Sequence, residues 1–299
     1  MTSIKDIKEI AGKHLGRTSD GGFTAPYITP DKHDKTLIVP IPREIGRSSG
    51  NVDASRFVGY EVWHAYEMSF LRSNGQPVTG VLRVFFPATS TSMIESKSHK
   101  LYLNSFDLER FSSVEEVEAI IQKDLSEALQ ANIRVKLHLA EDKVDFKKIF
   151  KLSFKNVDKM SVSIDKFTED ASLLDESNTE GELTFHTTNL RSLCEITRQK
   201  DTANCFVYMK GDKLPSIESL FRYIISMRDA QHFHENVTET VFDTLSKKFE
   251  GADIAVINLF NRRGGLDIHC VRATSQEVLD KVTNNYDDVN TLFERTLQQ

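Results

Sequence analysis

Residues 60–86 read YEVWHAYEMSFLRSNGQPVTGVLRVFF, and this stretch predicts two strands joined by a tight turn. Aromatic and β-branched side chains fill Tyr60–Leu71 and Val78–Phe86, as is typical of strands. Between them, Ser73–Gln76 contains the dipeptide Asn74-Gly75, which favours a hairpin turn. The stretch therefore predicts an antiparallel hairpin at the start of a folded unit.

The rest of the chain predicts helices and strands in a regular order. Ser92–Phe106 predicts a helix, and Val114 to about Ala131 predicts another, because Ser112-Ser113-Val114-Glu115 is typical of a capping box. Ile133–Leu139 alternates as a strand does. The second half predicts, in order, strands at 182–190 and 204–209, helices at 216–228 and 235–249, strands at 254–260 and 267–271 joined by a turn at Gly264-Gly265, and a C-terminal helix at 275–297.

Three segments have weaker patterns. Residues 1–58 predict an irregular lead-in, with a short helix at Ile4–Lys13 and a proline-broken, extended stretch at 37–43. Residues 141–180 are charged and leave room for one more strand. The acidic and small polar residues of 169–181 are typical of a linker, so the predicted domains are 59–170 and 181–299.

An internal repeat relates the two halves. Ile94-Glu95-Ser96 recurs as Ile217-Glu218-Ser219 at an offset of 123, within a similar order of elements. Each half then contains two strands, two helices and two strands, if 141–180 supplies the missing strand of the first half. Such halves predict an α+β fold of antiparallel sheets with paired helices on one face.

The bulk composition is that of a water-soluble globular protein. The chain has 299 residues, of which 39% are hydrophobic and 27% charged, and its net charge of -6 gives no general attraction to nucleic acid or to anionic membranes. No apolar run approaches the roughly 20 residues of a membrane helix, and the first residues lack the apolar stretch of a signal peptide. The three cysteines have no pairing pattern, which favours a reducing cytoplasm.

Residues 94–102, IESKSHKLY, form a dense polar cluster. Its mixed charges and hydroxyls suit a ligand with hydrogen-bond donors and negative charge. A solvated helix face is the alternative, because Lys97 and Lys100 are three residues apart and share a face. At the offset of 123 these lysines correspond to Leu220 and Tyr223, so the two halves are expected to have divided the work.

A second candidate site is Cys194 with Asp201. Cys194 follows a predicted strand end, where site residues often lie, and Asp201 is near enough in sequence to exchange protons with a nucleophilic thiol. The alternative is a buried, inert thiol, since free cysteine is among the most buried residue types. Cys205 and Cys270 lie inside predicted strands and are assigned to the core.

Two further motifs lie in the second half. His232-Phe233-His234-Glu235 is either the first turn of a helix or part of a polar site. No metal is predicted there, because the cysteines lack the spacing of a zinc site. Arg262-Arg263-Gly264-Gly265-Leu266-Asp267 forms a cationic turn that is either a phosphate contact or a hairpin turn with solvated arginines.

Together these stretches resemble a family, the nitrile reductases that convert 7-cyano-7-deazaguanine to 7-aminomethyl-7-deazaguanine in queuosine biosynthesis. The resemblance rests on Glu95–Phe106, which is similar to the family's marking motif, supported by Trp63–Ser69, Leu193-Cys194, Phe233-His234-Glu235 and Arg262–Ile268. It extends from about Leu37 to Arg272 and is closest to the long, two-domain form. It implies two tandem tunnelling-fold domains related to GTP cyclohydrolase I, NADPH as cofactor, no metal, a homodimer and a role in tRNA modification.

The resemblance also implies residue roles. Cys194 would be the nucleophile, forming a thioimidate with the nitrile carbon, and Asp201 the proton donor. The heterocycle would be held by Ile94, Glu95, Ser96, His234 and Glu235, and the NADPH by Ser96, Lys97, Arg263 and Gly264. Because the first motif and the nucleophile lie in different halves, the site is expected where the halves meet.

The chain departs from the family pattern after the nucleophile. Where the family has proline and tryptophan around the aspartate, this sequence has Lys200 and Thr202, and Glu195 adds a carboxylate next to Cys194. Two other functions stay open: a zinc-dependent, cyclohydrolase-like enzyme of the same fold acting on a pterin or purine, and a non-catalytic protein that binds the deazaguanine.

Overall fold

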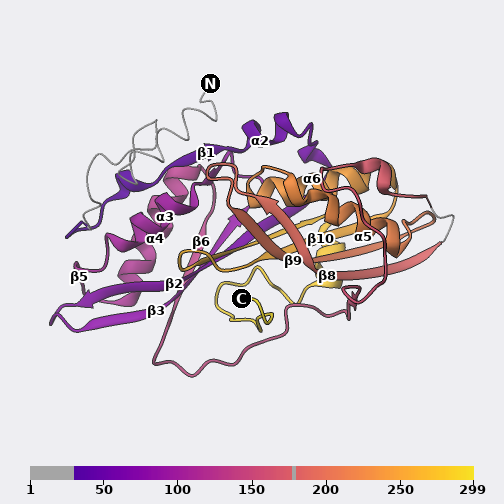
Figure 1. Ribbon diagram of the computed structural model, residues 1–299. Coiled ribbons are helices and arrows are strands. Elements are labelled where there is room, and N and C mark those ends of the chain that lie inside the picture. The colour runs from indigo at the N-terminus through magenta and orange to yellow at the C-terminus, as the bar shows by residue number, and fades with distance from the viewer. Residues whose placement is uncertain (1–29, 177–179) are drawn as a thin grey trace. The chain divides into compact units, whose positions relative to one another are not determined.

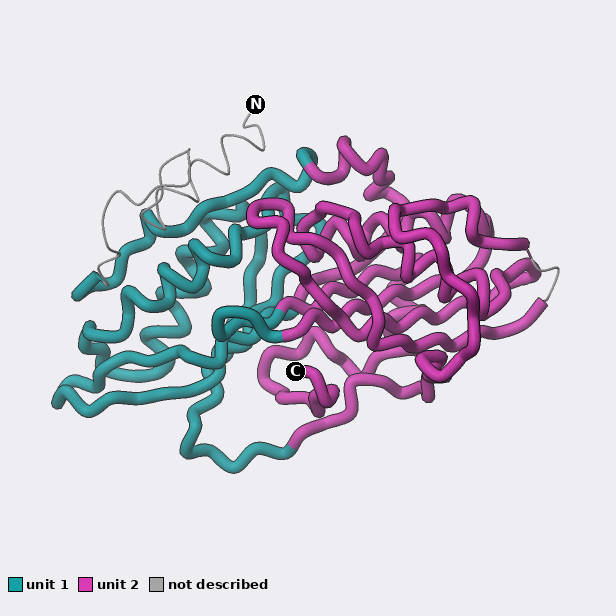
Figure 2. The backbone as a smooth tube through the Cα atoms, viewed as in Figure 1, with its two compact units in different colours: residues 1–45, 62–145, 262–267 teal, residues 46–61, 146–261, 268–299 magenta. Residues whose placement is uncertain are grey.

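A computed structural model describes residues 30–176 and 180–299 and contains two compact units (Figure 2). Of the described residues, unit 1 takes 30–45, 62–145 and 262–267, and unit 2 takes the remainder. The predicted helix at Ile4–Lys13 lies outside the described residues. No helix in the described ranges is both long and apolar enough to cross a membrane.

The sheet of unit 1 contains the predicted hairpin. Strand β2 (Val58–Arg72), most of which belongs to unit 1, neighbours β3 (Pro77–Pro87), and β3 pairs antiparallel with β6 (Arg134–Leu139). The hairpin turn is confirmed, since the Gln76 carbonyl accepts a hydrogen bond of 2.8 Å from the Arg72 N–H. Gly75 has a φ of 86°, a value that glycine adopts without strain. The two-residue strand β5 (Arg110–Phe111) lies parallel to the end of β2.

The helix predicted over Ser92–Phe106 is shorter, because its first residues form a strand. Strand β4 (Ser92–Ile94) pairs antiparallel with β1 (Pro40–Pro42), and α3 (Ser96–Asn104) begins only after Glu95. The Glu95 carboxylate caps the helix by accepting a hydrogen bond of 2.7 Å from the Ser98 N–H. The lead-in is also more ordered than expected, with a 3-10 turn η1 (Lys35–Leu37), helix α2 (Arg43–Ser49) and a second 3-10 turn η2 (Ala54–Arg56).

The second helix of unit 1, α4 (Val114–Leu129), is capped one residue later than predicted. Ser113 is the N-cap and accepts the Glu116 N–H at 3.2 Å. The Glu116 carboxylate in turn accepts the Ser112 N–H at 2.8 Å, so Glu116 rather than Glu115 completes the cap. Figure 1 shows α3 and α4 beside the strands of this unit.

Unit 2 contains a larger antiparallel sheet. Strands β8 (Gly181–Leu193), β9 (Lys200–Gly211), β10 (Asp253–Phe260) and most of β11 (Leu266–Ala273) follow one another as neighbours. The strand allowed for in 141–180 exists as β7 (Lys155–Asn156), but it pairs parallel with β8. It therefore does not extend the sheet of the first half, as the repeat required.

The helices of unit 2 cover one face of this sheet. Figure 1 shows α5 (Ile217–Ser226), which η4 (Met227–Asp229) continues, and α6 (His234–Lys248) along the same side of β8 to β10. The last helix, α7 (Gln276–Val282), ends far short of the predicted residue 297. The chain turns away because the Asn284 N–H bonds the Ile149 carbonyl at 2.8 Å and Asn285 takes a left-handed φ of 53°. The 3-10 turn η3 (Ala171–Leu173) lies in the predicted linker.

Matching hydrogen bonds in α3 and α5 correct the offset of the repeat from 123 to 121. In each helix one serine bonds the carbonyl of the N-cap residue and a second serine bonds a tyrosine carbonyl. The matching pairs are Glu95 and Ser216, Ser98 and Ser219, Tyr102 and Tyr223, and Ser105 and Ser226. Lys97 therefore corresponds to Glu218 and Lys100 to Phe221, so the positive charges of the first copy are absent from the second.

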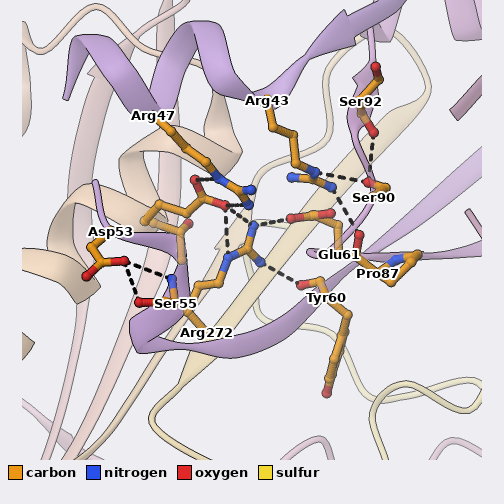
Figure 3. A network of polar contacts seen from close by, with 12 residues as sticks. Arg43, Arg47, Asp53, Ser55, Tyr60, Glu61, Pro87, Ser90, Ser92 and Arg272 are labelled. Carbon is orange, nitrogen blue, oxygen red and sulfur yellow. Dashed lines mark hydrogen bonds and ion pairs between the residues drawn. The ribbon is translucent and has the colours of Figure 1, made fainter. Parts of the chain in front are cut away.

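A buried ion network ties α2 and α6 to β11 in unit 2. The fully buried Arg272 guanidinium donates to the carboxylates of Glu61 and Glu239 and to the Tyr60 carbonyl (Figure 3). Arg47 adds a second guanidinium on Glu239, at 2.8 Å. Burial alone would lower the pKa of Arg272, but the two carboxylates outweigh it and hold that pKa above its usual value. Four charged groups are thus paired with one another, three of them fully buried, which fixes α6 against the sheet.

His99 in α3 gives the fold a testable pH dependence. Its ring is fully buried beside Trp63, and its two nitrogens have no hydrogen-bond partner in the described ranges. Burial lowers the pKa of His99 to about 3. The unfolded chain takes up a proton near pH 6.5 that the folded chain refuses, so stability falls as the pH drops from about 6.5 towards 3.

We expect His99→Leu to flatten this dependence. Between about pH 6 and 4, the unfolding free energy of the unmodified protein should fall by about 1.4 kcal/mol per pH unit more than that of the variant. Urea unfolding at pH 7, 6, 5 and 4 measures both slopes. Equal slopes would show that His99 is protonated in the folded protein or exposed.

Candidate active site

Cys194 lies at the end of β8, in the turn that leads into β9. Its N–H donates to the Gln199 carbonyl at 2.8 Å, and its carbonyl accepts the Arg198 N–H at 2.9 Å. These bonds close the loop without the family's proline, and Arg198 takes a left-handed φ of 55° to do so. Thr202, in place of the family's tryptophan, accepts a hydrogen bond of 2.7 Å from the Asn261 side chain. The departures from the family pattern therefore leave a closed, bonded loop.

Segment 230–232 holds this loop from the side of α6. The Leu193 N–H bonds the Ala230 carbonyl at 2.8 Å, and the His232 N–H bonds the Leu193 carbonyl at 3.1 Å. Gln231 donates its side-chain amide to the Glu195 carbonyl at 2.8 Å. The end of β8 and the start of α6 are thus fixed against each other.

Asp201 is the first buried residue of β9 and lies next to His234. Only 5% of Asp201 is exposed, and its Oδ2 lies 3.6 Å from Nε2 of His234. The His234 ring packs edge-on against Phe260, with ring centres 4.2 Å apart. The structure therefore brings together two predicted site residues, a buried carboxylate and an imidazole.

Glu235 occupies the first turn of α6 and is buried, with 3% exposed. A carboxylate is favoured there by the positive end of the helix dipole. The N-cap position, Phe233, offers no side-chain hydrogen bond. His232, the other histidine of the motif, has its Nε2 3.8 Å from Oε2 of Glu169.

The three cysteines differ sharply in their surroundings. Cys194 is half-buried, whereas Cys205 and Cys270 are fully buried, as predicted for the core. Burial raises the pKa of Cys205, and it raises that of Cys270 with help from the carboxylates of Glu235 and Glu61. Both buried thiols stay protonated, so among the three only Cys194 is placed to act as a thiolate.

The polar cluster of unit 1 lies at the start of α3. Ile94 and Glu95 are buried, with 4% and 2% exposed, while Ser96 and Lys97 are half-buried. One oxygen of Glu95 caps the helix, and its other oxygen lies 3.7 Å from Nζ of Lys97. Sequence reasoning missed the capping role, because glutamate is an uncommon N-cap residue.

The cationic turn of unit 1 follows Asn261. The Arg263 N–H bonds the Leu266 carbonyl at 2.8 Å, and Gly264 and Gly265 have φ values of 61° and 81°. Positive φ at both central positions is typical of a type I′ hairpin turn, which needs glycine-like residues. A small pocket of about 10 Å³ is lined by this turn, Lys100 and Glu67. It has room for roughly one water molecule, so it is not a preformed nucleotide pocket.

Three contacts with Tyr66 hold this turn in place. Its N–H bonds the Gly265 carbonyl at 2.9 Å, its ring lies under the Arg262 guanidinium at 3.6 Å, and its hydroxyl donates to Asp267. His64 Nδ1 lies 2.6 Å from the same carboxylate. Sequence reasoning missed Tyr66 and His64 as supports, because about 200 residues separate them from the turn.

The residues predicted for the cofactor fit a phosphate-bearing ligand. Lys97 and Arg263 supply positive charge, and Gly264 leaves its backbone open, since nothing but a distant Lys100 carbon would meet an added Cβ. Ser96 adds a hydroxyl at a helix start, where anions are favoured. These four residues all belong to unit 1, and Cys194, Asp201, His234 and Glu235 all belong to unit 2. That both sets act in one site stays a prediction.

Comparison with known proteins identifies the family of this chain. Residues 29–137 match the family described as nitrile reductase, 7-cyano-7-deazaguanine-reductase N-term, and residues 201–278 match that described as QueF-like protein. The chain is similar to an NADPH-dependent 7-cyano-7-deazaguanine reductase of Hahella chejuensis, with 38% identity over 268 residues, 87% of this chain and 92% of the relative. A protein of the same name from Coxiella burnetii is 34% identical over 264 residues, 87% of this chain and 93% of the relative.

Proposed function

Because the chain belongs to the family of NADPH-dependent 7-cyano-7-deazaguanine reductases, we propose that it reduces the nitrile of 7-cyano-7-deazaguanine to an aminomethyl group. The observation that supports this proposal is the half-buried Cys194 at the end of β8, on the hairpin whose other strand, β9, carries the buried Asp201 next to His234. Nitrile activation needs a nucleophilic thiol, a proton donor and polar side chains that surround the reacting group.

Cys194 is the proposed nucleophile. A nitrile carbon resists direct hydride attack, but a thiolate adds to it and forms a carbon–sulfur bond, giving a thioimidate. As the bond forms, negative charge builds on the nitrile nitrogen. Asp201 gives that nitrogen a proton and becomes a carboxylate, which the neighbouring His234 can stabilise at 3.6 Å.

Two carboxylates are proposed to recognise the heterocycle. Glu95 and Glu235 are both buried, and a carboxylate accepts the N–H groups along a guanine-like edge. Glu95 has one oxygen committed to the α3 cap, which leaves the oxygen near Lys97 for the ligand. Ile94, Ser96 and His234 complete the proposed contacts with the heterocycle.

The NADPH is proposed to be held by Lys97, Arg263, Gly264 and Ser96. Each NADPH would supply one hydride when bound, so two molecules would be used in turn for each nitrile. The charges of Lys97 and Arg263 suit its phosphates, and arginine can hold a phosphate through two hydrogen bonds. Gly264 allows the backbone to approach closely, because no side chain stands in the way.

The assembly and setting follow from the same proposal. We infer two repeats of a tunnelling fold, a homodimer, and no metal. The outer strand β6 of unit 1 leaves an edge that a second copy can cover. Three unpaired cysteines support a reducing, cytoplasmic setting, and the product is proposed to enter tRNA modification.

Cofactor consumption tests this function. Purified protein mixed with 7-cyano-7-deazaguanine should oxidise two NADPH per nitrile. The loss of nicotinamide absorbance measures this oxidation. Metal analysis of the same sample separates the alternatives. Stoichiometric zinc with no NADPH oxidation would favour a cyclohydrolase-like enzyme, and tight nitrile binding with no oxidation would favour a binding protein.

Lys97→Met is expected to weaken NADPH use without weakening nitrile binding. Losing one charged phosphate contact should raise the KM for NADPH by about tenfold, equivalent to about 1.4 kcal/mol. Steady-state kinetics and calorimetry with the nitrile alone measure the two effects. Lys123→Met, which removes an exposed lysine of α4, is the control and should leave both unchanged. An unchanged KM in Lys97→Met would remove Lys97 from the cofactor contacts.

A further inference from the structure

Ser192 is a buried polar residue whose hydroxyl has no hydrogen-bond partner in the part of the chain that the structure describes. Only 1% of the residue is exposed, so the hydroxyl is shielded from bulk water. A buried hydroxyl without a partner destabilises a folded protein, and such groups are rare unless they serve a function. Ser192 lies two residues before Cys194, the proposed nucleophile.

The register of the hairpin places Ser192 directly opposite Asp201. These two residues are cross-strand partners in the antiparallel pair of β8 and β9. Directly opposite side chains lie on the same face of a sheet, with Cβ atoms about 4.5–5.5 Å apart. Rotation of the serine side chain therefore brings its hydroxyl within hydrogen-bond reach of the Asp201 carboxyl.

Cys194 shares this face. The Cys194 N–H bonds the Gln199 carbonyl at 2.8 Å, so the pairing of the two strands continues to the thiol. Residues two apart on a strand point to the same side. Ser192, Cys194 and Asp201 thus lie on one face of the hairpin, and His234 meets that face at Asp201.

We propose that Ser192 is a positioning residue that stabilises the carboxylate of Asp201 after proton transfer. This inference rests on the proposed function. As the Cys194 sulfur bonds the nitrile carbon, the electron pair of a carbon–nitrogen π bond moves to nitrogen. The O–H bond of Asp201 breaks, an N–H bond forms, and the new carboxylate accepts the Ser192 hydroxyl proton in a hydrogen bond. Before the transfer that hydroxyl has no charged partner, so its bond favours the later state alone.

Ser192→Ala tests this role by separating activity from stability. The rate of thioimidate formation, followed by quenched-flow mass spectrometry with the nitrile alone, should fall by about 10- to 100-fold. The melting temperature should stay unchanged or rise, because the variant loses an unsatisfied buried hydroxyl. Because the variant lacks a hydrogen bond that favours the carboxylate, the loss of rate at high pH should move to higher pH.

Two further variants give the inference its controls. Ser246→Ala removes a buried hydroxyl that already bonds the Asp243 carbonyl at 3.0 Å, so it should lower the melting temperature and keep the rate. Ser192→Thr keeps the hydroxyl and should recover most of the rate. A Ser192→Ala protein with the unmodified rate at every pH would overturn the inference. A loss of rate that is fully explained by unfolding of the variant would also overturn it. If the unmodified protein forms no thioimidate, the proposed function itself fails.

Discussion

Cys194→Ala is expected to lose nitrile reduction by at least roughly 10³-fold. The alanine cannot add to the nitrile carbon, and direct hydride transfer to a nitrile is intrinsically slow. Affinity for 7-cyano-7-deazaguanine should stay within about threefold, because the proposed contacts of Glu95 and Glu235 remain. Turnover with NADPH and calorimetry with the nitrile measure the two quantities separately.

Cys205→Ala is the matched control for this loss. Cys205 is fully buried and burial raises its pKa, so its thiol takes no part in the reaction. The variant should lose stability by about 1 kcal/mol, as large-to-small core changes do, but keep its turnover below its melting temperature. Retained nitrile reduction in Cys194→Ala would rule out the thioimidate route.

Asp201→Asn is expected to slow thioimidate formation by about 10²- to 10⁴-fold, the usual contribution of a positioned acid. An amide cannot give up a proton as charge builds on the nitrile nitrogen. The variant should still bind the nitrile and should lose the fall in rate at high pH, since the titrating carboxyl is gone. Rates of thioimidate formation between pH 5 and 9 measure both effects.

The control for this second effect is Asp229→Asn. Asp229 is exposed at the end of η4, in the segment that precedes His234. Its amide variant should keep the rate and the pH profile of the unmodified protein. If Asp201→Asn also kept at least half of the rate, another residue would have to supply the proton.

Local sequence patterns predicted the long strands β2, β3, β6 and β8 to β11 and the middle of α3 to α6, but not α2 or the short strands β4 and β5. The hairpin of β2 and β3 follows from alternation and from Asn74-Gly75, which act over a few residues and need no distant partner. Helix ends were less predictable. The helix predicted from Ser92 begins only at Ser96, because Glu95 caps α3. Asn285 helps to end the C-terminal helix, because the chain there bonds residue 149.

The repeat was visible in the sequence, but its offset was not. Identical letters at Ile94-Glu95-Ser96 and Ile217-Glu218-Ser219 suggested 123, whereas the helix caps align at 121. The reason is physical: a cap is defined by its hydrogen bond, and glutamate serves in one copy where serine serves in the other. Letter matching across the two copies cannot detect this exchange.

Some residues of the candidate site could be predicted from the sequence and others could not. Cys194, Asp201 and His234 stand out in the sequence by chemistry and by resemblance, and the structure places Asp201 beside His234. Ser192 does not stand out, since serine is common and its significance arises only from burial and a missing partner. The supporting role of Tyr66 could not be predicted from the sequence either, because its three contacts with the cationic turn join residues far apart in the chain.

The intact mass of the protein after incubation with 7-cyano-7-deazaguanine alone decides whether the reaction passes through a thioimidate. The thioimidate route predicts a mass increase of one nitrile molecule per chain, located by peptide mapping at Cys194. Addition of NADPH should return the protein to its original mass as the product leaves. An unmodified mass in a protein that nevertheless consumes NADPH with the nitrile would show that reduction needs no covalent bond to Cys194.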